Sequence, residues 1–318
     1  MCILAPLLFC ATTLNAAQIV PSGAPFSLMQ ELVPSLFDAP FQKQIQDCEY
    51  GAIREELLRK IATVQGDEKA QLEVVLATVY VKDQKEEEAF QIFLGALSDV
   101  PQKNLAKPSM DELQIYSSAL PIYLEQAKCP ASQAAKELES KLAPVLVEHP
   151  EYVQVRFLFA AAKANQHQYE DFFYHFYKAY SQNQNCFLAY RTLGILNIKL
   201  FEKARLIDEK ELRRQEMQKF LHLALKENVN DVALYKLLIV FSPAESRKKA
   251  VHEVIDMIIQ NSVQVPRSDI SFYINEAMAA SEKESAESFL DKQATWYQYS
   301  RIIEEMRKVV SDDKNGNS

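Results

Sequence analysis

The sequence predicts an all-α chain built from antiparallel helix pairs, and three observations support this prediction. Similar segments begin at Val153 and at Phe187, 34 residues apart, and a period of this size is typical of stacked helix–turn–helix repeats. Only 6 of the 318 residues are glycine, and the one pair of the Asn-Gly type, the usual signal of a tight β-hairpin, lies at residues 315–316. Long runs rich in Ala, Leu, Glu, Lys and Gln favour helix by intrinsic propensity.

The first 40 residues predict an exported protein. No Lys or Arg precedes Lys43, residues 3–12 form a short apolar run, and Ala16 and Ala17 follow it. A secretory signal peptide ends in this way. The apolar run is too short for a bilayer-spanning helix, which needs about 20 apolar residues. We therefore expect a signal peptide at residues 1–17, no integral membrane span, and a location in the periplasm or cell envelope of a bacterium.

Two alternatives remain for the amino terminus. It is either a buried helix of a cytoplasmic protein, or it carries a lipid on Cys10, because Leu7, Leu8 and Phe9 before this cysteine resemble a lipobox. Lipidation would give membrane association, but Phe9 stands where a small residue is usual. Residues 18–40 contain four prolines, which block helix continuation. They predict an extended lead-in with one helical turn near residues 27–32.

Composition excludes several classes of function. The net charge of −8 gives no general attraction to nucleic acid phosphates. The five cysteines lack the paired spacing of a disulfide framework or of a C-x-x-C metal or redox site. The five histidines form no H-E-x-x-H motif, and the chain has neither G-x-S-x-G nor a glycine-rich phosphate loop. We therefore expect no catalytic residues, no metal and no cofactor.

Residues 70–104 carry the clearest repeat. Its characteristic positions hold Leu76, Ala77, Tyr80, Ala89, Phe93, Ala96 and Pro101. This pattern resembles the tetratricopeptide repeat (TPR), with Glu73 where the family prefers Trp. Residues 153–261 resemble it by register, and Tyr190, Leu193 and Gly194 follow the family's W-x-x-L-G order with Tyr in place of Trp. The resemblance implies a right-handed superhelical solenoid of antiparallel helix pairs over residues 41–309, whose concave groove holds a protein or peptide segment.

The remaining segments fit this array less regularly. Residues 41–63 carry a helical apolar stripe, as do residues 111–126 and 131–148, but Pro121 and Pro144 predict a kink or break in the last two. Extra residues near 201–212 form either a loop on the working face or, as we favour, a longer helix pair. Residues 269–281 predict a helix, residues 285–309 a single capping helix, and residues 310–318 a disordered tail.

Residues 169–180 crowd aromatic side chains onto one helix, which has only one buried stripe. We favour packing between repeat units over an exposed aromatic patch for a partner. The family's groove positions, together with this helix, suggest partner-binding residues, namely Phe157, Tyr174, Tyr177, Arg191, Ile195, Lys199 and Lys236. The resemblance does not extend to a clamp for a partner's terminal carboxylate, because Ala161, Ile195 and Val240 stand where that clamp has Asn.

The function expected from these observations is that of a non-enzymatic scaffold or adaptor of TPR type. One alternative is an envelope hydrolase that uses the helical array as a platform, which would require facing carboxylates with shifted pKa values. Adjacent glutamates such as those at 86–88 point in different directions around a helix and do not form such a pair. The other alternative is a cytoplasmic secretion chaperone or effector.

Overall fold

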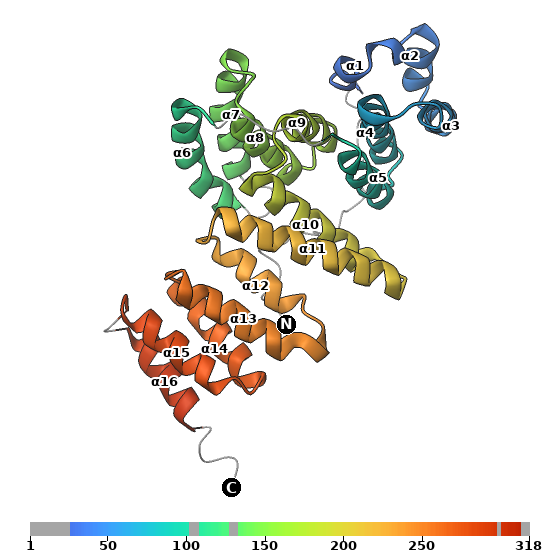
Figure 1. Ribbon diagram of the computed structural model, residues 1–318. Helices are drawn as coiled ribbons and strands as arrows, with labels where there is room; N and C mark the ends of the chain where they lie inside the picture. Colours follow the sequence, from blue (N-terminus) through green and yellow to red (C-terminus); the bar gives the residue numbers. More distant parts are fainter. Residues whose placement is uncertain (1–25, 102–107, 127–132, 298–299, 313–318) are drawn as a thin grey trace. The chain divides into compact units, whose positions relative to one another are not determined.

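A computed structural model describes residues 26–101, 108–126, 133–297 and 300–312, and within these ranges all regular structure is helical (Figure 1). The elements are α1 (Met29–Leu32), η1 (Pro34–Leu36), α2 (Ala39–Gln46), α3 (Tyr50–Ile61), α4 (Gly66–Lys82), α5 (Glu86–Ser98), α6 (Met110–Gln126), α7 (Gln133–Glu148), α8 (Val153–Asn165), α9 (Tyr169–Gln182), α10 (Phe187–Lys203), α11 (Ile207–Glu227), α12 (Val232–Val240), η2 (Ala244–Ser246), α13 (Arg247–Gln260), α14 (Arg267–Ala279), α15 (Lys283–Ala294) and α16 (Arg301–Asp312). The all-α prediction is confirmed.

The chain divides into two compact units, residues 1–217 and residues 218–318, and the division falls within α11. None of the helices in the described ranges combines the length and the apolar composition needed to cross a bilayer. The predicted signal peptide at residues 1–17 and the predicted lipidation at Cys10 lie outside the described ranges. The predicted disordered tail begins too early, because α16 continues to Asp312, and its remaining residues lie outside the described ranges.

In the first unit, α4 and α5 form the predicted helix pair. Leu76 of α4 and Ala89, Phe93 and Ala96 of α5 are buried, as the pattern of residues 70–104 requires. The two helices are joined by a short turn in which Gln84 has a positive φ of 61°. Small alanines let the helices approach closely, and the Phe93 ring fills the space beside them.

The aromatic helix α9 packs against this pair. The ring of Phe93 lies 4.4 Å from that of Phe173, 5.6 Å from that of Phe172 and 5.8 Å from that of Phe176. Phe90 adds an edge-to-face contact with Tyr169 at 5.2 Å. Ring pairs at such distances stabilise a fold by more than the burial of their surface alone. The crowding of residues 169–180 is therefore explained by packing between helix pairs, as expected.

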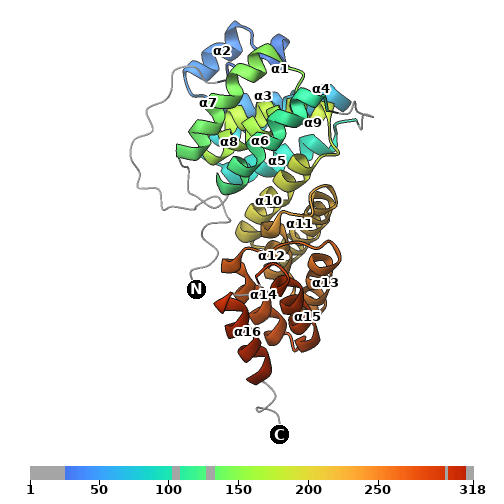
Figure 2. The ribbon, with the colours of Figure 1, turned by 90° about the vertical axis from the view of Figure 1, so that its left-hand side faces the viewer.

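The order of packing in the first unit differs from the order of the chain. α9 contacts α4 and α5 on one side, whereas α6 and α7 contact α8, so the pair α8–α9 lies between two pairs that precede it (Figure 1; Figure 2 looks onto the side of α6 and α7). In a regular solenoid each repeat contacts only its neighbours along the chain. The pair α6–α7 is therefore a departure from simple sequential stacking.

In the first unit the structure corrects the expected helix breaks at Pro121 and Pro144 and confirms the expected longer helix pair near residues 201–212. α6 and α7 continue through Pro121 and Pro144 without ending. Both prolines are exposed, as are Ser117 and Ser140 four residues earlier, so water can satisfy the carbonyl groups that proline leaves without a helical partner. The extra residues near 201–212 form no long loop, because α10 and α11 make the longer helix pair that we favoured.

The segment from Phe26 onward is more structured than an extended lead-in. The helical turn near residues 27–32 is present as α1, and η1 and α2 follow it. Phe26, Met29, Leu36 and Phe37 are buried. The predicted lead-in therefore contributes to the hydrophobic core, at least over the part that the structure describes.

In the second unit, Tyr273 of α14 is fully buried, its ring lies 5.4 Å from that of Phe289 in α15, and its hydroxyl donates to the Val232 carbonyl of α12 at 3.1 Å. The predicted single helix over residues 285–309 is wrong, because α15 ends at Ala294 and α16 begins at Arg301. The buried Gln293 side chain bonds the backbone of Val263 and Val265 at 3.1 and 3.0 Å. The Tyr297 hydroxyl donates to the Val265 carbonyl at 3.0 Å. These contacts fix the chain near Gln293 and Tyr297 to the segment before α14, so the helix does not continue past Ala294.

Candidate functional site

The structure places most of the predicted partner-binding side chains in the hydrophobic core. The buried ones are Phe157, Tyr174, Tyr177, Arg191 and Ile195. Lys199 and Lys236 are half-buried. Lys236 belongs to the second unit and the others to the first. The set does not form one surface within either unit, and its role in partner binding stays a prediction.

The two predicted tyrosines on α9 are engaged by earlier parts of the chain. Tyr177 donates its hydroxyl to Asp67 Oδ1 at 2.8 Å, and Tyr174 donates to the carboxylate of Glu31. Burial, and then the hydrogen bond to a carboxylate, raises the pKa of each hydroxyl well above its usual range. Both tyrosines therefore act as neutral donors that fasten α9 to α1 and α4.

The two predicted lysines are held by neighbours within their own units. Lys199 Nζ lies 5.3 Å from the ring centre of Phe90 and 5.6 Å from that of Tyr169. Burial lowers the pKa of its ammonium group to about 8. Lys236 Nζ lies 2.6 Å from Asp269 Oδ1, and the cation also stands over the ring of Phe272.

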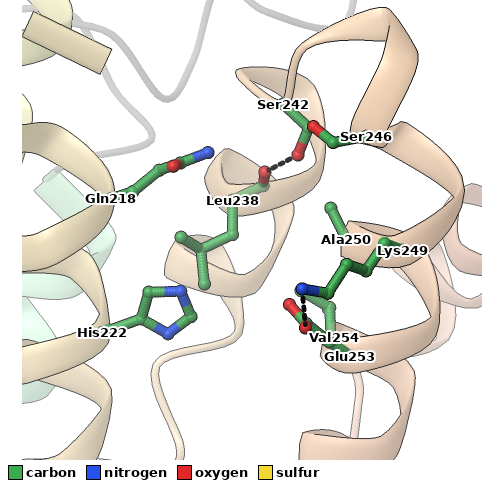
Figure 3. A pocket seen from close by; sticks show the side chains of 9 residues that line it. All are labelled: Gln218, His222, Leu238, Ser242, Ser246, Lys249, Ala250, Glu253 and Val254. Atoms are coloured by element: carbon green, nitrogen blue, oxygen red, sulfur yellow. Dashed lines mark hydrogen bonds and ion pairs between the residues drawn. The ribbon is translucent and has the colours of Figure 1, made fainter. Parts of the chain in front are cut away.

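The second unit contains a hollow that the predicted set does not include. It has a volume of about 170 Å³ and opens between the last turns of α11, the end of α12 and the start of α13 (Figure 3). Its lining residues are Gln218, His222, Leu238, Ser242, Ser246, Lys249, Ala250, Glu253 and Val254. α12 has nine residues, whereas α13 has 14. The hollow lies where the chain leaves the short α12 and turns toward α13.

The base of the hollow is apolar and its two walls are polar. Leu238 and Val254 are buried, while Gln218 and His222 stand on the α11 side and Lys249 and Glu253 on the α13 side (Figure 3). The amide of Gln218 and the imidazole of His222 have no hydrogen-bond partner among the described residues. These two groups are free to bond a ligand that enters from solvent.

The serines of the hollow turn their hydroxyl hydrogens toward the backbone. Ser242 donates to the Leu238 carbonyl at 2.6 Å, and Ser246 donates to the Pro243 carbonyl at 3.4 Å. Their oxygens still accept hydrogen bonds. A serine used in this way lacks the partnered base that a nucleophile requires.

The charges around the hollow are balanced. Lys249 Nζ lies 3.5 Å from Glu253 Oε1, and both side chains are exposed. Surrounding protein lowers the pKa of His222 by withholding water from the imidazolium; nearby Glu253 opposes this shift and Lys226 adds to it. The lowered pKa favours the neutral imidazole of His222. Across the part of the chain that the structure describes, no three side chains of the His, Cys, Asp or Glu type gather as metal ligands.

Sequence reasoning missed the hollow because it depends on the length of one helix. Leu238 lies in the segment at 153–261 that resembles the repeat, but a buried leucine in such a segment carries no sign of an open space beside it. The usable signal was Pro243, which ends the helical stretch early, since proline cannot continue it. The neighbouring first helix α10 runs for 17 residues.

Comparison with known proteins adds no relative: no protein-family model matches the chain, and no curated protein or solved structure matches it either.

Proposed function

We propose that this chain is a non-enzymatic scaffold of the TPR type, and that a side chain of another polypeptide seats in the hollow between α11, α12 and α13. The observation that carries the proposal is the combination of an apolar base, formed by Leu238 and Val254, with unpartnered polar groups on the wall at Gln218 and His222. Protein interfaces are built in this way, with an apolar centre inside a polar rim.

The size of the hollow suits one side chain rather than a cofactor. An apolar cavity of about 150 Å³ takes up a benzene ring in another protein, and ligand pockets for small molecules are typically about 300 to 1,000 Å³. At about 170 Å³ the hollow matches the side chain of a leucine, isoleucine or methionine. The amide of Gln218 is placed to bond the backbone that carries such a side chain.

The proposed architecture is a right-handed solenoid whose units are the pairs α4–α5, α8–α9, α10–α11 and α12–α13. The 34-residue spacing from Val153 to Phe187 and the buried repeat positions of α4 and α5 support it. The pair α6–α7 is an addition to this array, because it packs on α8. We further propose export to a bacterial envelope, on the basis of the apolar residues 3–12 and the absence of Lys and Arg before Lys43.

A site-specific photo-crosslink tests the binding proposal. Lys248 and Lys249 are adjacent, and both are well exposed at 65% and 79%. Only Lys249 lines the hollow, whereas Lys248 pairs with Glu282 at 3.3 Å. A photoreactive residue is placed at position 249 in the full chain, with position 248 as the matched control, and both proteins are irradiated in cells that make the protein.

The expected result is a discrete protein adduct from position 249 that is absent from position 248, with the partner peptide then identified by mass spectrometry. Equal adducts from both positions, or none from position 249, would remove the hollow as the binding site. Export is tested separately by the mass of the mature chain, because an intact Met1 on the native protein contradicts cleavage.

A further inference from the structure

Two adjacent aliphatic side chains stand exposed at the turn between α10 and α11. Leu206 is 69% and Ile207 84% exposed. They lie between Arg205 and Asp208, which are also exposed and have no ion-pair partner within the described residues. Single exposed aliphatic residues are normal on protein surfaces. A neighbouring pair at a projecting turn, flanked by unpaired charges of opposite sign, resembles the core of an interface.

This turn, which we call the apex (residues 205–208), is connected to α5 by one polar contact on each side. Lys203 Nζ lies 3.2 Å from Glu87 Oε1, and Gln91 donates to Glu209 Oε1 at 2.9 Å, so both sides of the apex are tied to α5. Beneath it, the guanidinium of Arg214 stands 5.2 Å from the ring centre of Phe201. Contacts of this kind restrict the apex before a partner binds, and a restricted surface loses less conformational freedom on binding.

The apex and the hollow complement each other in shape and polarity. The hollow needs an aliphatic side chain, and the apex offers Ile207 and Leu206 at its most exposed point. The rim of the hollow presents Lys249 and Glu253, and the apex presents Asp208 and Arg205. Lys249 and Glu253 already pair with each other, and each also has a charge of opposite sign on the apex with which it can pair when the apex is seated.

We infer that the apex of one copy of this chain seats in the hollow of a second copy. This inference rests on the proposed function, since it names the polypeptide that fills the hollow. The apex lies in the first unit and the hollow in the second, so the two contacting surfaces differ. Such a heterologous contact joins copies head to tail, and it builds a ring if the rotation closes or an open chain if it does not.

The test is sedimentation of the purified full chain over a range of concentrations. Wild-type protein is expected to associate beyond a dimer as concentration rises. Ile207→Glu disables the apex, and Ala250→Phe fills the hollow; each should weaken association by about tenfold or more, because each prevents the burial of an aliphatic side chain. Val147→Glu is the matched control, since Val147 is 82% exposed elsewhere in the first unit.

Mixing the two disabled proteins gives the sharper result. Ile207→Glu retains a working hollow and Ala250→Phe retains a working apex, so an equimolar mixture should stop at a one-to-one dimer. Thermal unfolding checks that each variant is folded, and Ser246→Phe replaces Ala250→Phe if the latter is not. A wild-type chain that stays monomeric at every concentration, an Ile207→Glu protein that associates as Val147→Glu does, or a mixture without dimer overturns the inference.

Failure of this inference is distinguishable from failure of the proposed function. A monomeric wild-type chain whose position 249 still crosslinks to a different protein removes self-association and keeps the scaffold. A crosslink from position 249 to residues 205–208 of a second copy supports both.

Discussion

The hydroxyl of Tyr177 donates to the carboxylate of Asp67 at 2.8 Å, across 110 residues of sequence. This bond joins α9 to the first turn of α4, at the end of the aromatic interface centred on Phe93. It shows that the aromatic helix is fastened at its polar edge as well as through its rings.

Removing that bond should cost a modest amount of stability. Tyr177→Phe keeps the buried ring and loses the hydroxyl, so the free energy of unfolding should fall by about 1 kcal/mol. Asp67 is exposed, which limits the loss because water can replace the donor. Urea unfolding of Tyr177→Phe, Asp67→Ala and the double variant forms a double-mutant cycle. Additive losses would mean that the two groups do not interact.

Phe93 should be among the most sensitive positions of the first unit. It is fully buried and touches three rings of α9. Phe93→Ala should lower the free energy of unfolding by about 3 to 5 kcal/mol, since the cavity it leaves cannot collapse among rigid rings. Phe93→Leu should cost clearly less. A loss below about 1 kcal/mol for the alanine variant would contradict the packing described for this interface.

Lys163 should matter more than a surface lysine of equal charge. The Lys163 side chain is nearly buried, and its ammonium lies 2.8 Å from Glu139 and 2.9 Å from Asp171, which joins α7, α8 and α9. Lys163→Met leaves two carboxylates without their cation, and it should cost about 2 kcal/mol, a value reduced because both partners are partly exposed. Lys249→Met removes an exposed pair and should cost less than about 0.5 kcal/mol. Equal thermal stability of the two variants would refute this contrast.

His175 should make stability depend on pH. Burial first, and then the cations Arg156, Lys163 and Lys178, lower the pKa of its imidazole to about 3, against about 6.5 in an unfolded chain. The unfolded state therefore binds more protons between these values. The contribution of neutral His175 is fully present above about pH 6.5 and is lost as pH falls toward 3, by at most about 1.4 kcal/mol per pH unit.

The comparison with His175→Gln isolates this contribution. Unfolding free energies of wild type and variant at pH 7.5 and at pH 5 should show a smaller decline for the variant, because glutamine does not titrate. His167 and His222, whose pKa values are also lowered, remain in both proteins and cancel in the difference. Parallel declines would show that His175 is protonated as easily in the folded state as in the unfolded state.

The spacing of apolar residues predicted the helix pairs well, but it did not predict which other helices each pair packs against. The spacing of Ala89, Phe93 and Ala96 identified the buried face of α5, because a helix places such residues on one side. It did not say that this face would meet Phe173, 80 residues later, since nothing in a periodic pattern names the surface that covers it. For the same reason Tyr174 and Tyr177 could be assigned to a groove although the chain itself occupies their surroundings.

The errors in the predicted helix boundaries also arise from the surroundings of the helices, which the local sequence does not describe. Pro121 and Pro144 should interrupt helices by local rules, but exposure of the freed carbonyl groups makes the interruption unnecessary. The stripe over residues 285–309 continued past Ala294, where the tertiary contacts of Gln293 and Tyr297 end the helix. The hollow depends on the early end of α12 before Pro243, and a proline that ends a helix does not by itself predict an open space beside that end.

The packing of α9 on α4 and α5 also determines how early the first unit can fold during synthesis. The aromatic face of α5 has no cover until the ribosome has delivered the 70 residues between Ser98 and Tyr169 and then α9 itself. Closing a loop of that length costs entropy before any contact repays it, and non-local contacts slow folding. Phe90 and Phe93 are thus apolar surface on the nascent chain throughout that interval, and a chaperone would find its binding segment there.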